Sequence, residues 1–161
     1  AYKEGFGADF WAPLEQYWSS GVPTDRNALR QALKIDAVKS QYMGGSPDPS
    51  LIEPESYTLD QALLDRPGNE KIQLDLFYDY RTNVDLYPRF QEYFRSSGVP
   101  VLTMWGKNDV IFVPPGAEAF ARDVKKLETR WLNTGHFALE TNEVQFATEI
   151  DLFLKKYNAF N

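Results

Sequence analysis

The sequence predicts an α/β protein of one-domain size, with a helical region, residues 1–97, preceding a parallel β-α-β-α unit, residues 98–161. Two observations carry this prediction. Before residue 98 the apolar side chains recur at helical spacing between breaks rich in proline and glycine. After that point the run VPVLTMW is short and almost wholly apolar, which is typical of a strand buried on both faces of a parallel sheet.

The helical region begins with ADFWAPLEQYW, residues 8–18, which we expect to be a short helix ending at a Gly-Val-Pro break. The side chain of Thr24 is suited to cap a second helix that extends to residue 42. Residues 44–55 contain two glycines and three prolines and are expected to form a loop.

Three more helices are expected before the sheet. Thr58 and Gln61 have capping-box spacing and predict a helix that opens there and reaches about Asp65. The apolar periodicity then predicts an amphipathic helix over 69–83 and another over 86–97.

The second region alternates strand and helix. Strands are predicted at 100–105 and 128–133, with a helix around 115–126 between them and a last helix from Asn142, as its cap, to about residue 157. A strand-helix-strand unit of this kind is almost always a right-handed parallel crossover.

Composition excludes several classes of protein. The chain has 17 basic and 23 acidic residues and a net charge of −6, which argues against binding to a nucleic-acid backbone. It has no cysteine, so disulfides, thiolate zinc sites and cysteine nucleophiles are excluded. Its single histidine, His136, excludes a multi-histidine metal site, and we expect no metal and no cofactor.

The sequence shows no signal peptide and no apolar run of about 18 residues, so we expect a soluble protein that binds no membrane. A cytoplasmic location is the prediction, with secretion left open. The first residue is Ala1 instead of methionine, which favours a processed or truncated chain.

Two polar residues follow the two predicted strands. Asp109 lies in the turn after the first strand and His136 in the turn after the second. Because parallel strands present their carboxyl ends at one edge of the sheet, the two side chains can meet there as an acid and a base. The alternative remains open that Asp109 is a turn residue and His136 a structural or surface residue.

The segments PVLTMWGKNDVIF and LNTGHFALE resemble the carboxyl-terminal part of the α/β-hydrolase fold. The match in pattern and order involves Trp105, Gly106, Asp109, Gly135 and His136. The resemblance implies that Asp109 is the acid and His136 the base of a catalytic triad. It also implies that the helical region is the cap inserted between the sixth and seventh core strands of this family.

Within the family, the chain resembles epoxide hydrolases and haloalkane dehalogenases, and DYRTN resembles the part of the cap where epoxide hydrolases carry an active-site tyrosine followed by an arginine. Tyr80 and Arg81 would fill those places, with Tyr80 donating a hydrogen bond to an epoxide or carbonyl oxygen. Tyr80 also shares a predicted helical face with Ile72 and Leu76, which favours the alternative role of a core aromatic residue with its hydroxyl at a wet boundary. Tyr78 and Tyr42 compete with it for the donor role.

Trp105 and Phe137 are further candidates for lining a substrate site, and packing alone is the alternative role for both.

No serine of the chain lies on a strand-to-helix turn of the kind that carries a hydrolase nucleophile. The resemblance therefore implies that nucleophile, oxyanion hole and preceding strands lie in a missing amino-terminal half. Two strands also leave a sheet edge unpaired, so we expect the partner to be that half or a second copy of the chain.

Two functions follow from these observations. The first is an epoxide hydrolase-like enzyme acting on small apolar substrates, in which this chain alone is inactive. The alternative is a non-catalytic interaction or binding module formed by a truncated hydrolase half.

Overall fold

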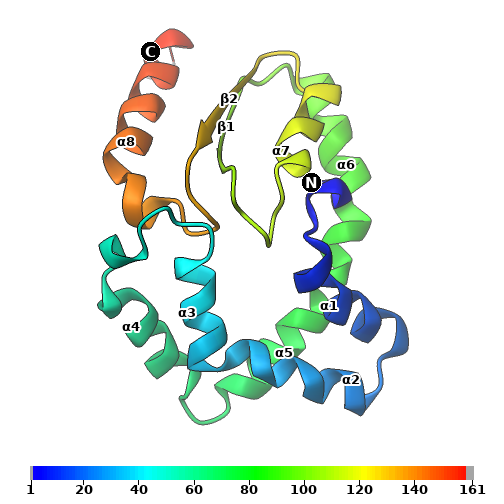
Figure 1. Cartoon of the computed structure of the whole chain (residues 1–161). Coiled ribbons are helices and arrows are strands. Elements are labelled where there is room, and N and C mark those ends of the chain that lie inside the picture. The colour runs from blue at the N-terminus through cyan, green and yellow to red at the C-terminus, as the bar shows by residue number, and fades with distance from the viewer. Residues whose placement is uncertain (1, 159–161) are drawn as a thin grey trace.

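The computed structural model describes residues 2–158, and in it a set of helices surrounds one end of a two-stranded parallel sheet (Figure 1). The α-helices are α1 (Ala8–Ser20), α2 (Pro23–Ala28), α3 (Ile35–Met43), α4 (Pro54–Leu64), α5 (Asn69–Asp79), α6 (Arg81–Ser97), α7 (Pro115–Glu118) and α8 (Leu139–Lys156). The 3₁₀ helices are η1 (Lys3–Gly5), η2 (Leu29–Leu33), η3 (Pro49–Leu51) and η4 (Ala119–Arg122).

The sheet confirms the predicted parallel pair. Strand β1 (Val101–Gly106) runs beside β2 (Leu127–Leu132) in a register that pairs Trp105 with Trp131. The crossover passes through α7 and η4, and α8 follows β2 on the other side of the strands (Figure 1). The β-α-β-α order that the sequence predicts is therefore present.

Strand β1 is not buried on both faces, contrary to expectation. Only Thr103 and Gly106 of its six residues are buried, because its second edge pairs with no strand within residues 2–158. This edge exposes backbone N–H and C=O groups that are able to pair with another segment.

An ionic cluster holds α8 against β2. Arg130 on β2 lies 2.6 Å from Glu149 on α8 and 2.9 Å from Glu128 on its own strand, while Lys156 on α8 lies 2.7 Å from Glu128. Hydrogen bonds from Lys156 and Arg130 lower the pKa of the Glu128 carboxyl to about 2.

The predicted single helix over 25–42 is wrong. It divides into α2, η2 and α3 because Lys34 adopts an extended conformation (φ −96°, ψ 152°). The break lets the two parts fill different cores. Leu29 and Leu33 pack with α1 and Leu74, whereas Val38 and Tyr42 of α3 pack with Ile52.

Three predicted caps are also wrong. The helices expected to open at Thr24 and Thr58 begin earlier, at Pro23 and Pro54, because proline already has the backbone angle of a first helical residue. The last helix begins at Leu139, and Asn142 forms a kink inside it (φ −132°, ψ 23°).

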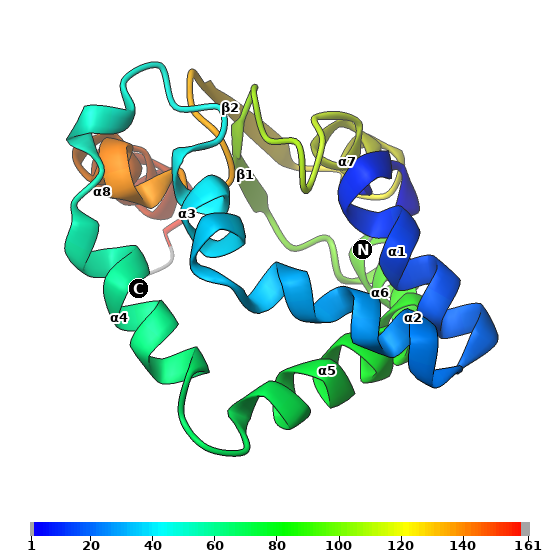
Figure 2. The same ribbon diagram turned by 60° about the horizontal axis from the view of Figure 1, so that its bottom comes forward.

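The predicted buried face of residues 69–83 is wrong too. Ile72 and Leu76 are 55% and 53% exposed, and Leu74 is the buried residue of α5. The helix ends at Asp79, and Tyr80 forms the junction with α6. Figure 2 shows α5 lying along the edge of the helical region farthest from the strands.

None of the helices within residues 2–158 is long and apolar enough to cross a membrane.

Candidate active site

The turn after β1 is built around the side chain of Asp109. Its Oδ1 accepts hydrogen bonds from the backbone N–H groups of Ile111, at 2.8 Å, and Phe112, at 2.9 Å. An aspartate side chain commonly closes a turn in this way. The carboxylate is buried, and these two bonds fix its direction, so that Oδ2 is left for another partner.

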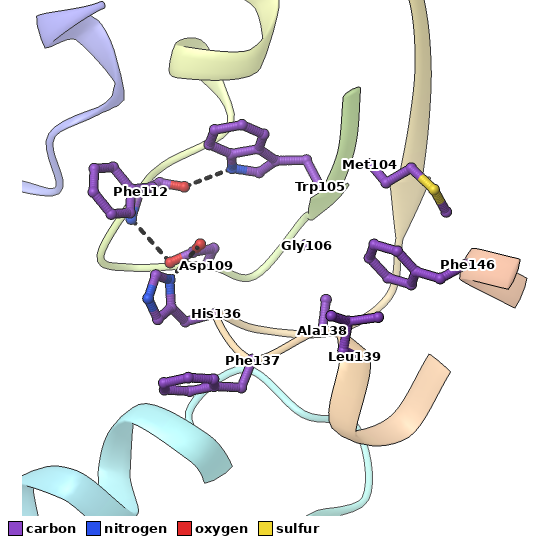
Figure 3. A pocket seen from close by; sticks show the side chains of 10 residues that line it. All are labelled: Met104, Trp105, Gly106, Asp109, Phe112, His136, Phe137, Ala138, Leu139 and Phe146. Carbon is purple, nitrogen blue, oxygen red and sulfur yellow. Dashed lines mark hydrogen bonds and ion pairs between the residues drawn. The ribbon is translucent and has the colours of Figure 1, made fainter. Parts of the chain in front are cut away.

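That partner is His136, which follows β2. Its Nδ1 lies 3.0 Å from Oδ2 of Asp109, so the two side chains meet at the sheet edge as expected (Figure 3). A proton on Nδ1, donated to the carboxylate, leaves Nε2 unprotonated and able to act as a base. The His136 side chain is 26% exposed, and Nε2 has no hydrogen-bond partner within the described part of the chain.

The pair borders a hollow of about 300 Å³ (Figure 3). The lining is mainly apolar and consists of Met104, Trp105, Gly106, Asp109, Phe112, His136, Phe137, Ala138, Leu139 and Phe146. The candidate substrate-contacting residues Trp105 and Phe137 both belong to it. The indole N–H of Trp105 donates to the carbonyl of Phe112 at 2.7 Å, which fixes the indole against the turn that carries Asp109.

Tyr80 does not border this hollow. Its ring is stacked with Trp18, at a centroid distance of 6.0 Å, and its hydroxyl lies 3.4 Å from that of Tyr87. Trp11 packs against Tyr80 at 5.1 Å and against Phe112 at 5.2 Å, so a continuous aromatic cluster links the tyrosine to the site. The donor role of Tyr80 stays a prediction.

The competing tyrosines have other contacts. Tyr78 packs against Tyr17, and the Arg81 guanidinium stacks on the Tyr78 ring at 3.7 Å. The hydroxyl of Tyr42 donates to Asp60 at 2.6 Å, so it is not free to act as a donor to substrate.

Sequence reasoning missed the residues that join the helical region to the two turns. The Asn108 amide donates to the carbonyl of Gly45 at 2.9 Å and to Oδ1 of Asn133 at 3.1 Å. A β-carbon on Gly135 would collide with the carbonyl of Gly44. The Gly44-Gly45 pair was visible in the sequence as a turn signal, but no local pattern shows what the turn touches.

The amino-terminal segment braces the same site. The indole N–H of Trp11 donates to the carbonyl of Ile111 at 2.8 Å, and the N–H of Gly7 donates to the same carbonyl at 3.0 Å. Phe6 forms an isolated antiparallel bridge with Phe112. Residues separated by about a hundred positions therefore support the turn that carries Asp109.

No group of three potential metal-ligating side chains occurs in residues 2–158. The contact between Asp109 and His136 is the chemically distinctive feature of the site.

Comparison with known proteins gives the fold. The chain is 47% identical over 153 residues to the Saccharomyces cerevisiae protein "Uncharacterized hydrolase YNR064C", covering 93% of this chain and 53% of the yeast protein. A protein from Acinetobacter baumannii assigned as a lipase superposes with a TM-score of 0.61 at 20% identity, over 100% of this chain and 50% of that one. The chain has part of an α/β-hydrolase fold.

A thermophilic esterase shows the same likeness, with a TM-score of 0.50 and 22% identity over 84% of this chain and 51% of the esterase. No family model matches the sequence. The chain spans about half the length of each of these relatives.

Proposed function

We propose that this chain supplies the acid and the general base of a hydrolase, with Asp109 orienting His136, while the nucleophile comes from a segment outside these 161 residues. The observation that carries the proposal is the Nδ1–Oδ2 contact of 3.0 Å together with the two backbone bonds to Oδ1. They hold the imidazole with Nε2 free. The names of the yeast relative and of the two structural neighbours are consistent with this chemistry.

The proposed role of His136 is to activate water against a covalent enzyme–substrate ester. Nε2 takes a proton from the water as its oxygen adds to the ester carbonyl, and the imidazolium is stabilised by the Asp109 carboxylate. The bond between the carbonyl carbon and the departing oxygen then breaks, and that oxygen recovers a proton from Nε2. The apolar hollow beside the pair favours small apolar substrates such as epoxides, haloalkanes or esters.

The Tyr80–Tyr87 pair supports the epoxide hydrolase-like form of the proposal. Their hydroxyls lie 3.4 Å apart in an aromatic cluster, and one donates to the other, so that one hydroxyl proton of the pair is left for an epoxide oxygen. Burial and the neighbouring Tyr80 raise the pKa of the Tyr87 hydroxyl, so it stays protonated and able to donate.

The test is hydrolysis of a chromogenic ester and of an epoxide by the chain alone and by the chain mixed with the part of the yeast relative that it does not match. We expect no turnover by the chain alone, because the proposed nucleophile and oxyanion hole lie outside it and a single oxyanion donor is worth ~10²–10³ in rate. We expect turnover by the mixture, abolished by His136→Ala. Turnover that survives His136→Ala would contradict the proposal.

The second candidate is a non-catalytic module that binds another polypeptide, which the open edge of β1 favours. Tight association with the complementary part and no turnover of any substrate class would support it.

A further inference from the structure

The residue after the candidate base is clamped by a tyrosine of the helical region. The rings of Phe137 and Tyr42 stack face to face, with centroids 4.0 Å apart and planes 6° from parallel. The Phe137 ring meets that of His136 edge to face at 5.1 Å. Because His136 and Phe137 are adjacent and their rings are in contact, the packing of the Phe137 ring restricts the position of the imidazole. Figure 3 shows Phe137 pointing to the helix α3 side of the site.

Tyr42 is itself held in place. It lies at the end of α3, buried in a small core with Val38 and Ile52. Its hydroxyl donates to Oδ2 of Asp60 on α4 at 2.6 Å. Burial and this carboxylate raise the pKa of the Tyr42 hydroxyl, so the donor keeps its proton over the working pH range. The ring is therefore fixed both by packing and by a charge-assisted hydrogen bond.

Other contacts from the same part of the chain reach the same turn. The carbonyl of Gly44 lies against Gly135, directly before His136. Farther along, the Ser56 hydroxyl donates to Oε2 of Glu140 at 2.8 Å. The helical region thus contacts the chain before the imidazole, at Gly135, beside it, at Phe137, and after it, at Glu140.

We propose that Tyr42, anchored by Asp60, is a positioning residue that holds His136 in line with Asp109 by clamping Phe137. The role in catalysis rests on the proposed hydrolase function, whereas the positioning itself does not. Without the Tyr42 ring, the Phe137 ring is free to move away from α3, and the hydrogen bond between Nδ1 of His136 and Oδ2 of Asp109 lengthens. A free imidazole then exchanges between its two neutral tautomers, and less of it carries the proton on Nδ1.

The single histidine makes a direct test possible. The ring nitrogens of His136 are observed by ¹⁵N NMR in the full chain at a pH where the imidazole is neutral. Tyr42→Met keeps an apolar side chain of adaptable shape but removes the flat ring. We expect the separation between the two ¹⁵N resonances to shrink in Tyr42→Met and to shrink less in Tyr42→Phe, which restores the stack but not the hydrogen bond to Asp60. Tyr93→Met, at a 57% exposed tyrosine of α6, is the matched control and should change nothing.

In the mixture with the complementary hydrolase part, kcat of Tyr42→Met should fall about 10- to 100-fold with KM within about threefold, because a displacement near 1 Å can cost ~10²-fold. Tyr42→Phe should recover most of the loss. If Tyr42→Met does not fold, Asp60→Ala is measured instead, and a smaller shift in the same direction is expected. A folded Tyr42→Met, or Asp60→Ala in its place, with wild-type resonances overturns the inference. A shifted tautomer in a mixture that hydrolyses nothing, even as wild type, supports the positioning and refutes the proposed function.

Discussion

Substitutions of Asp109 distinguish its effect on the proton of His136 from its hydrogen bonds to the backbone of the turn. Asn has nearly the same shape as Asp, and its side-chain oxygen still accepts the two backbone bonds from Ile111 and Phe112. Its amide nitrogen, however, faces Nδ1 of His136 and donates to it, so the imidazole proton moves to Nε2. The base is then in the wrong tautomer, and we expect kcat of the complemented enzyme to fall by about 10⁴-fold, which corresponds to roughly 5 kcal/mol.

The expected effect on stability is different for Asp109→Asn and Asp109→Ala. Asp109→Ala removes the acceptor and leaves two backbone N–H groups without a partner, at about 1–3 kcal/mol each. We therefore expect Asp109→Ala to lower the free energy of unfolding by about 2–6 kcal/mol and Asp109→Asn to lower it much less. Denaturant unfolding measures the stability, ¹⁵N NMR of the single histidine measures the tautomer, and ester hydrolysis by the mixture measures the rate.

Two results would refute this reasoning. One is equal destabilisation by Asp109→Asn and Asp109→Ala, which would mean that the backbone bonds to Oδ1 do not hold the turn. The other is an unchanged tautomer in a folded Asp109→Asn, which would mean that the contact with His136 does not set the position of the proton.

Three further predictions follow from the packing and the charges. Hydrogen bonds from Lys156 and a neighbouring arginine lower the pKa of Glu128 to about 2, so this carboxyl stabilises the fold above its ordinary pKa near 4.5 and loses that effect as pH falls toward 2. Glu128→Gln should therefore make Tm depend less on pH between these two values, and an unchanged dependence of Tm on pH would contradict the prediction. Leu74→Ala removes a side chain with no solvent exposure and should lower the unfolding free energy in urea by about 2–5 kcal/mol, whereas a loss under 1 kcal/mol would show that the core collapses around the gap. Gly135→Ala places a methyl group against the Gly44 carbonyl and should lower both Tm and turnover by the mixture. Wild-type values of both would show that the backbone at Gly44 and Gly135 moves apart at no cost in stability or rate.

The sequence by itself determined that Asp109 and His136 lie side by side. Asp109 follows one predicted strand and His136 follows the next. Their side chains meet if the two strands are parallel and adjacent, because the carboxyl ends of the strands then lie at one edge of the sheet. The parallel pairing of β1 and β2 and the contact between Asp109 and His136 agree with this expectation. Local patterns were also sufficient for the existence of most helices, because periodicity and breaks by proline and glycine are local properties.

Tertiary structure alone decided how the helical region meets these two turns. Lys34 breaks a helix that periodicity predicts as continuous, because the residues on either side fill different cores. Tyr80, placed near substrate by resemblance, packs in an aromatic cluster instead of bordering the hollow, and Tyr42 clamps the residue beside the base. These contacts join segments that are far apart in the sequence. They depend on which surfaces of the chain pack together, and the local spacing of residues does not predict that packing.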